Sequence, residues 1–351
     1  MPGENNILLF GEFCSVTDET NSSSGLELHW ETEDKTTIQD IASSSQVIVI
    51  VLNDGTSYSF GFNTFGQLGI GSNSFCQKFT KVSSNTSFIS VSCGSNFTLW
   101  RSVNNELFVA GESFTTTPQR FSSTKVISMS AYETTFAIID DSGMVKLWPT
   151  FSQSHQPFCC CLPSQPSEIS CGKDFASVLC NGSVFRINKS GIFEPLVTIG
   201  QYSDGTPSAT CIRSSADYTI VLDRSQNVWL YGNVGNLSRK ISTTPIAKEI
   251  RSIYAMPNFC AFVNNLGITY TFGENGSGQL ADGTRLKRTR IVETTVSRPV
   301  IFIVGGKTFS VFVSIQFDPS LFQINMEEFV PGHMSCPFEK AEDMIDGQTS
   351  P

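Results

Sequence analysis

Histidine is nearly absent from this 351-residue chain, which contains only three, and charged residues account for only 16% of the sequence. The histidines His29, His155 and His333 are far apart, so the pattern does not indicate a catalytic or metal site built on imidazole groups. Other absences are equally informative. The chain has no nucleophile elbow, phosphate-binding loop, dinucleotide fingerprint or metalloprotease helix motif. We therefore expect no catalytic residue, no cofactor and no bound metal.

The sequence also lacks long apolar segments. No stretch approaches the roughly 18 uninterrupted apolar residues of a membrane-spanning helix. The N-terminus does not show the basic and then apolar pattern of a secretory signal. We expect a protein without a membrane span. Its expected location is the cytoplasm, with the nucleus as the alternative.

Cysteine is comparatively frequent, with eleven residues, an odd number that favours free thiols in a reducing compartment. His155 followed by Cys159, Cys160 and Cys161 resembles a metal-binding cluster. However, alternate side chains of an extended strand face opposite ways, so three adjacent cysteines do not converge on one ion. We interpret these cysteines as structural.

The strongest positive signal is a fragment that occurs twice. The segment 58–71 reads YSFGFNTFGQLGIG, and the segment 270–283 reads YTFGENGSGQLADG. The two share an aromatic-Gly pair, an Asn, a Gly-Gln-Leu and a closing Gly at equal spacing. A repeat of this kind indicates an array of similar structural units.

A common template extends the repeat to seven copies. Each copy begins with an apolar residue, and the starts are Ile41, Val91, Met129, Ile169, Ile212, Ile253 and Ile303. Two positions later every copy has a small residue: Ser43, Cys93, Ala131, Cys171, Ser214, Ala255 or Gly305. Six positions after the start stand Val47, Phe97, Thr135, Phe175, Tyr218, Phe259 and Phe309, most of them bulky. The small residues suggest strands crowded around an axis, and the bulky ones suggest packing between neighbouring units.

Turn signals divide each copy into short strands. Asn-Asp-Gly at 53–55, Asp-Ser-Gly at 141–143 and Asn-Gly at 181–182 predict β-hairpins. Small antiparallel sheets repeated radially are typical of a β-propeller. The last copy lacks its hairpin, and the segment from Ile7 to Gly11 supplies the missing strand. We therefore predict an all-β, seven-bladed propeller over residues 1–316, closed by pairing of the N-terminal and C-terminal segments in one blade.

These motifs resemble the regulator of chromosome condensation repeat family. The resemblance covers roughly residues 5 to 315 and is clearest in the two Gly-Gln-Leu fragments and in Val91-Ser92-Cys93-Gly94. It implies a seven-bladed β-propeller. It also indicates eight repeat-signature residues with a structural role: Gly61, Gly66, Gln67, Leu68, Gly273, Gly278, Gln279 and Leu280.

The founding activity of that family is nucleotide exchange on the small GTPase Ran. Family repeats usually carry a histidine six residues after the start, and none of the seven copies here does. The segment 1–6 contains no Lys or Arg, so a basic N-terminal arm is missing as well. We therefore expect a monomeric protein-interaction or regulatory propeller without intrinsic catalysis. The alternative is a guanine-nucleotide exchange factor for a small GTPase other than Ran.

Charge and loop length suggest where a partner binds. The strongest basic cluster follows the second Gly-Gln-Leu fragment and consists of Arg285, Lys287, Arg288 and Arg290. It is either a docking site, for an acidic partner, a phosphoinositide head group or the chain's own acidic tail, or a solvated outer strand. Segment 317–351 is an acidic tail that holds −6 of the net charge of −9. It folds back onto the propeller, serves as a short interaction motif, or is solvated and partly disordered. An acidic chain disfavours direct nucleic-acid binding. The four middle copies have shorter connections, through reshaping for a partner or through drift.

Overall fold

The computed structural model describes residues 5–13, 26–28, 36–151, 156–196, 208–235 and 245–315. These residues form strands, turns and connections, and none of them lies in a helix. The described part accordingly offers no helical segment that could cross a membrane. The main compact part of the chain spans Pro2–Gln316. His29, His155, His333 and the acidic tail all lie outside the described residues.

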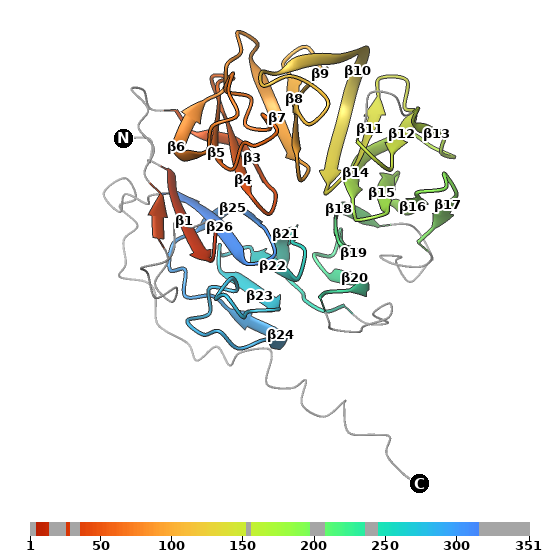
Figure 1. Cartoon of the computed structure of the whole chain (residues 1–351). Coiled ribbons are helices and arrows are strands. Elements are labelled where there is room, and N and C mark those ends of the chain that lie inside the picture. The colour runs from red at the N-terminus through yellow and green to blue at the C-terminus, as the bar shows by residue number, and fades with distance from the viewer. Residues whose placement is uncertain are drawn as a thin grey trace, which may run out of the picture. The chain divides into compact units, whose positions relative to one another are not determined.

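The strands pair in antiparallel sheets that follow one another around a common centre (Figure 1). The first sheet contains, in order, β3 (Ile38–Ser43), β4 (Val47–Leu52), β5 (Ser57–Gly61) and β6 (Cys76–Lys81). β3 is the innermost strand and β6 the outermost. We call the strands of each sequence copy a unit and number the units in chain order, so this sheet is the first unit. The order from inside to outside recurs in the later units.

The second and third units share one seven-stranded sheet. Its strands are β7 (Phe88–Cys93), β8 (Phe97–Ser102), β9 (Glu106–Gly111), β10 (Gln119–Tyr132), β11 (Thr135–Asp140), β12 (Val145–Trp148) and β13 (Phe158–Cys160). The first half of β10 pairs with β9, and its second half pairs with β11. One strand is thus the outer strand of one unit and the inner strand of the next, so the described strands form six sheets rather than one sheet per copy.

Three further sheets complete the middle of the chain. They contain β14 (Pro166–Cys171), β15 (Phe175–Cys180), β16 (Ser183–Asn188) and β17 (Phe193–Pro195); then β18 (Ala209–Ser215), β19 (Asp217–Asp223) and β20 (Val228–Asn233); then β21 (Ile250–Ala255), β22 (Phe259–Asn264), β23 (Thr269–Gly273) and β24 (Arg288–Glu293). Each sheet is built from sequential antiparallel neighbours.

The remaining sheet joins the two ends of the main compact part. Its order is β2 (Leu26–Leu28), β1 (Asn5–Gly11), β26 (Phe309–Ile315) and β25 (Val300–Gly305). β1 pairs with β26 over seven residue pairs, from Asn5 opposite Ile315 to Gly11 opposite Phe309. This is the strand pairing that the sequence predicts.

The predicted hairpins are present. Asn181 and Gly182 connect β15 to β16 and both have positive φ, 47° and 79°, as a two-residue type I′ turn requires. The template columns also have structural meaning. The small residues stand at or next to the ends of the inner strands, and the bulky ones stand at or next to the starts of the second strands. All seven residues of the second column are at most 7% exposed.

The hydrophobic core is divided into clusters that lie between consecutive units. Phe97 packs with Phe136 and Trp148 of the following unit, for example, and Phe309 packs with Ile48 and other residues of the first unit. The inner strands contact one another in the order β3, β7, β10, β14, β18, β21, β25, and β25 in turn contacts β3. Each unit is thus stabilised mainly by its neighbours.

Candidate functional site

The first Gly-Gln-Leu loop is held from within by one buried asparagine. The Asn63 Oδ1 accepts a hydrogen bond from the Leu68 N–H at 2.9 Å, and its Nδ2 donates to the Ser72 carbonyl at 2.6 Å. Leu68 is fully buried between the first and second units. The Thr98 hydroxyl of the second unit donates to the Gln67 carbonyl at 2.8 Å. The loop therefore fastens one unit to the next.

The second Gly-Gln-Leu loop repeats this arrangement. The Asn275 Oδ1 accepts from the Leu280 N–H at 2.9 Å, and Leu280 is fully buried. The Gln279 Nε2 donates to the Lys307 carbonyl at 3.1 Å, and the Ser310 hydroxyl donates to the Gln279 carbonyl at 2.6 Å. Lys307 and Ser310 belong to the following unit, so this loop is also an inter-unit fastener.

The glycine of each aromatic-Gly pair lies against the backbone of its own sheet. Gly61 and Gly273 have φ of 117° and 131°. A Cβ at Gly61 would lie 2.2 Å from the Gln46 carbonyl oxygen, and one at Gly273 would lie 2.5 Å from that of Asn258. Only glycine fits such positions without strain. Positive φ is also found at Gly66 and Gly278.

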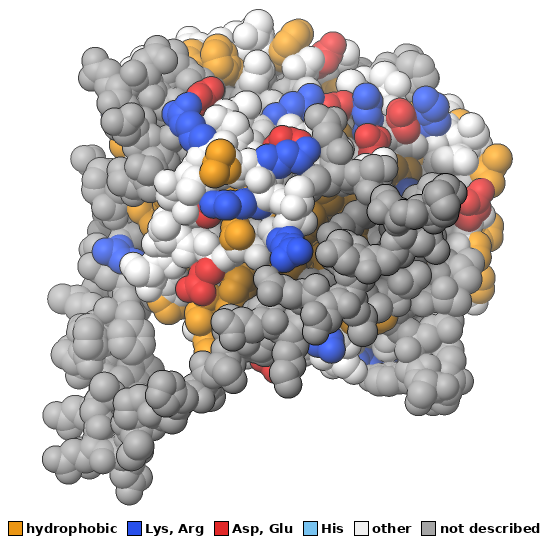
Figure 2. Space-filling view, turned by 90° about the horizontal axis from the view of Figure 1, so that it is seen from below, with side chains coloured by type: hydrophobic (Ala, Val, Ile, Leu, Met, Phe, Trp, Pro, Cys, Tyr) orange, Lys and Arg blue, Asp and Glu red, His pale blue; other side chains and the backbone are white. Residues whose placement is uncertain are grey.

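The basic cluster on and before β24 is largely neutralised within the chain. Lys287 pairs with Glu274 at 2.7 Å, and Arg288 pairs with Asp282 at 2.5 Å. Arg285 lies 3.6 Å from Glu12. Arg290 is exposed on the same strand. Figure 2 views the molecule from below Figure 1, where β24 lies, and shows Lys and Arg interspersed with Asp and Glu rather than gathered in one patch.

A set of polar side chains on the inner strands was not predicted from the sequence. The Asp40 Oδ2 accepts a hydrogen bond from the Val91 N–H of the next unit at 2.9 Å. The Glu168 Oε2 accepts a hydrogen bond from the Ile212 N–H at 2.9 Å, and the Glu168 Oε1 forms an ion pair with Arg213. Burial raises the pKa of Asp40 to about 6. These groups satisfy inner-strand donors that have no neighbouring strand toward the centre.

Serine hydroxyls do the same at other junctions. Each hydroxyl oxygen accepts a hydrogen bond from a backbone N–H of the following unit. The acceptor and donor residues are Ser92 and Ala131 (2.9 Å), Ser128 and Ile169 (3.2 Å), Ser130 and Cys171 (2.9 Å), and Ser170 and Ser214 (2.7 Å). In the sequence, these polar residues stand directly before or after the apolar residue that starts each copy, and this position is the signal that could have revealed them. The polar groups nearest the centre are thus engaged in holding units together.

The cysteines of the described residues are free. Burial raises the pKa of Cys93, Cys171 and Cys260 to about 12, so these thiols stay protonated at neutral pH. Cys159 and Cys161 are exposed at the outer strand β13. Nowhere in the described ranges do three or more His, Cys, Asp or Glu side chains gather as a metal site.

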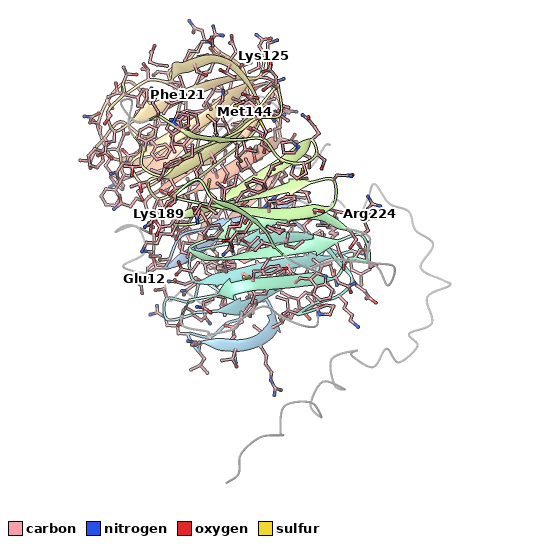
Figure 3. The ribbon with its side chains drawn as sticks, turned by 90° about the vertical axis from the view of Figure 1, so that its right-hand side faces the viewer. Glu12, Phe121, Lys125, Met144, Lys189 and Arg224 are labelled. Carbon is pink, nitrogen blue, oxygen red and sulfur yellow. The ribbon has the colours of Figure 1, made fainter. Side chains whose placement is uncertain are left out.

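The loops that follow the third strand of each unit lie on one side of the molecule. Figure 3 shows Glu12 and Lys189, which follow β1 and β16, on one side of the sheets and Arg224, which follows β19, on the opposite side. Both Gly-Gln-Leu loops follow the corresponding strands, β5 and β23. We call the side of Glu12 and Lys189 the loop side.

The first Gly-Gln-Leu loop displays three exposed aromatic side chains on the loop side. Phe62, Phe65 and Phe75 are 36%, 43% and 36% exposed, and the rings of Phe62 and Phe75 lie 5.0 Å apart. The second loop has Glu274 and Ser277 at the positions of Phe62 and Phe65. Exposed aromatic groups on a well-fixed loop are typical of protein-binding surfaces.

An open hollow of about 510 Å³ lies beside this loop, in the connection between β9 and β10. It is lined by Ser113, Phe114, Thr115, Gln119, Arg120 and Phe121. This is the first of the shortened connections. The Gly71 N–H of the neighbouring Gly-Gln-Leu loop donates to the Thr116 carbonyl at 2.8 Å, so the two loops are in contact.

Comparisons with known proteins agree with the fold. A family model described as the regulator of chromosome condensation (RCC1) repeat matches residues 54–100. No curated protein matches the chain. Human WBSCR16 has a similar structure, with a TM-score of 0.74 at 15% identity over 90% of this chain and 100% of that chain. Prp20p from Saccharomyces cerevisiae, whose structure is described with its binding to Gsp1p and histones, has a TM-score of 0.75 at 12% identity over 91% and 94%. The structure of yeast RCC1 (Prp20) bound by Kap60 has a TM-score of 0.75 at 12% identity over 91% of this chain and 90% of that one.

Proposed function

We propose that this chain belongs to the RCC1-type repeat proteins and is a protein-interaction module without intrinsic catalysis, built on a closed seven-bladed β-propeller. Two observations support the blade number and the closure. The inner-strand contacts run from β3 around to β25 and back to β3. The core clusters join each pair of consecutive units, including the last and the first.

The observation that carries the interaction proposal is the exposed aromatic trio of Phe62, Phe65 and Phe75. The buried Asn63 and Leu68 fix the backbone of the loop that bears these rings, so the loop is preorganised before any partner arrives. Preorganised aromatic groups contribute strongly to protein binding because little side-chain entropy is lost. The charged groups on the inner strands, in contrast, are engaged in bonds between units.

The alternative is nucleotide exchange on a small GTPase other than Ran. It is supported by the likeness in fold to Prp20p, whose structure is described with its binding to Gsp1p. Fold alone does not determine activity, and the two functions predict different behaviour. We propose a monomer that acts in the cytoplasm, with the nucleus as the alternative location, and with a protein rather than nucleic acid as the direct partner.

Affinity capture from cell lysate with the full chain, with and without EDTA, tests the proposal. EDTA removes Mg²⁺ and so promotes nucleotide loss from GTPases. Partners retained equally under both conditions, none of them a GTPase, are expected for an interaction module. A GTPase retained only with EDTA, whose labelled nucleotide is then released faster in the presence of the chain, would support the exchange-factor alternative instead. Failure to retain any protein reproducibly would contradict both.

A further inference from the structure

The chain contains the tripeptide Asn-Gly-Ser twice, at 181–183 and at 275–277, and these are its only two Asn-Gly pairs. We propose that Asn181 is a modification site at which the side-chain amide is lost spontaneously and isoaspartate forms, whereas the fold protects Asn275. This inference goes beyond the proposed interaction function and does not depend on it. It needs only the chain's own backbone and side chains, with water as the co-reactant.

The reaction requires a carboxamide that can meet the next backbone nitrogen. That nitrogen attacks the side-chain Cγ and loses its proton, a new N–C bond closes a succinimide ring, and the side-chain amide leaves as ammonia. Water then opens the ring at either carbonyl group. One opening gives aspartate, and the other gives isoaspartate, in which the main chain runs through the former side chain. Glycine in the second position favours the attack, because it has no Cβ to crowd the nitrogen.

Asn181 lies at the tip of the hairpin between β15 and β16, where Cys180 pairs with Ser183. Its side chain is exposed, and among the described residues no hydrogen bond holds its carboxamide or the Gly182 N–H. Figure 3 shows Arg224, at the corresponding hairpin of the next unit, on the side opposite the loop side. Gly182 itself is buried, so the attack follows local opening of the tip, which costs little free energy at an exposed turn.

Asn275 is the opposite case, although its tripeptide is the same. It is 0% exposed, and its Oδ1 accepts a hydrogen bond from the Leu280 N–H at 2.9 Å. Its Nδ2 donates to the Asp282 carboxylate at 2.9 Å and to the Thr284 carbonyl at 3.0 Å. Gly276 is exposed, so the protection comes from the fixed side chain and not from burial of the attacking nitrogen. Attack on Asn275 therefore requires these hydrogen bonds to break together.

The two products should affect the hairpin differently. Aspartate keeps the backbone unchanged, and Asp-Gly suits a type I′ turn as Asn-Gly does. Isoaspartate adds a main-chain atom to a two-residue turn, whose length sets the pairing of β15 with β16. The Gly182 carbonyl accepts a hydrogen bond from the Ala209 N–H at 3.0 Å, and Ala209 belongs to the core cluster between the fourth and fifth units. Isoaspartate at position 181 should therefore loosen this junction.

Peptide mapping by mass spectrometry tests the proposal on the full chain. Folded chain and urea-unfolded chain are incubated in warm, mildly alkaline buffer, and conversion of each asparagine is followed with time. An isoaspartyl methyltransferase, which methylates the isoaspartate carboxylate, distinguishes that product from aspartate. Two variants serve as controls. Asn181→Gly removes the reactive amide and leaves Gly-Gly, which also suits the turn, and Asn181→Asp reproduces the aspartate product.

In the folded chain, Asn181 should convert at least about tenfold faster than Asn275, because only the buried asparagine needs several hydrogen bonds to break. In urea the two rates should agree within about twofold, since the tripeptides are identical and the fold is lost. Equal rates in the folded chain, faster conversion of Asn275, or a difference of the same size in urea would overturn the inference.

Thermal unfolding tests the consequence for the junction. Chain that has accumulated isoaspartate at position 181 should unfold at a lower temperature than fresh chain. The Asn181→Gly variant aged in the same way should keep its unfolding temperature, and fresh Asn181→Asp should unfold like the original chain. Isoaspartate-containing chain as stable as fresh chain, or an equal loss in aged Asn181→Gly, would overturn the effect on the fourth and fifth units.

Discussion

Replacing Asn63 by alanine tests whether the Gly-Gln-Leu loop is a structural fastener. In the folded protein the Asn63 side chain is 1% exposed and makes two hydrogen bonds. The Asn63→Ala variant leaves the buried Leu68 N–H without an acceptor, which costs about 1–3 kcal/mol. The Ser72 carbonyl is only partly buried, so water replaces that bond at a cost of about 1 kcal/mol or less. We expect a loss of about 1–4 kcal/mol in the free energy of unfolding.

Urea unfolding followed by tryptophan fluorescence measures this loss. Trp100 is a suitable reporter, because it is buried in the core cluster that contains Leu68. The control is Asn73→Ala, an exposed asparagine of the same loop, which should change stability by less than about 0.5 kcal/mol. If the two variants were equally stable, the loop would not be held through Asn63 and the assignment of a fastening role would be wrong.

Other predictions concern closure, packing and charge. Deleting residues 1–13 removes β1 and exposes the edge of β26, so size-exclusion chromatography should detect aggregation; a stable monomer would contradict the closure. Leu280→Ala opens a cavity between units and should lower the free energy of unfolding by about 2–5 kcal/mol in the same urea assay. The pKa of Asp40 is raised from 3.8 to about 6, so the folded state binds its proton more tightly than the unfolded state. The contribution of this bound proton to the free energy of unfolding is fully present below pH 3.8 and is lost as the pH rises through about 6. The difference in thermal stability between the original chain and Asp40→Asn should therefore depend on pH across this window, and a constant difference would refute the assignment.

Much of the fold was predictable because its signals are local. A repeated turn motif, Asn-Gly at a hairpin and small residues at strand ends each impose a constraint on nearby backbone, so one sequence suffices to detect them. The sharing of β10 was not predictable. The sequence indicates that the third copy starts at Met129, but no residue marks whether a turn separates its inner strand from the outer strand of the second copy. Pairing with β9 and β11 decides this, and both partners are set by tertiary contacts.

The candidate sites were less predictable for the same reason. Four cations near β24 are visible in the sequence, but Glu12, Glu274 and Asp282, which face three of them, come from other segments or from across a turn. Asp40 and Val91 are 51 positions apart, so their hydrogen bond has no sequence signature. The hollow could have been suspected from the short connection after Gly111. Its aromatic lining depends on Phe151 and Trp148 of the next unit.

A comparison of the two Gly-Gln-Leu loops distinguishes the residues that hold the fold together from those that are available for recognition. Both keep the buried asparagine, the buried leucine and the carbonyl contact to the next unit. They differ at two positions that are exposed in the first loop, where Phe62 and Phe65 stand, while the second loop has the partly exposed Glu274 and the buried Ser277 there. Since the fastening contacts are the same, those exposed positions are free to vary without loss of the fold. Recognition should therefore depend on residues outside the repeat signature, and the loop with aromatic side chains is where substitutions should change binding while leaving stability nearly constant.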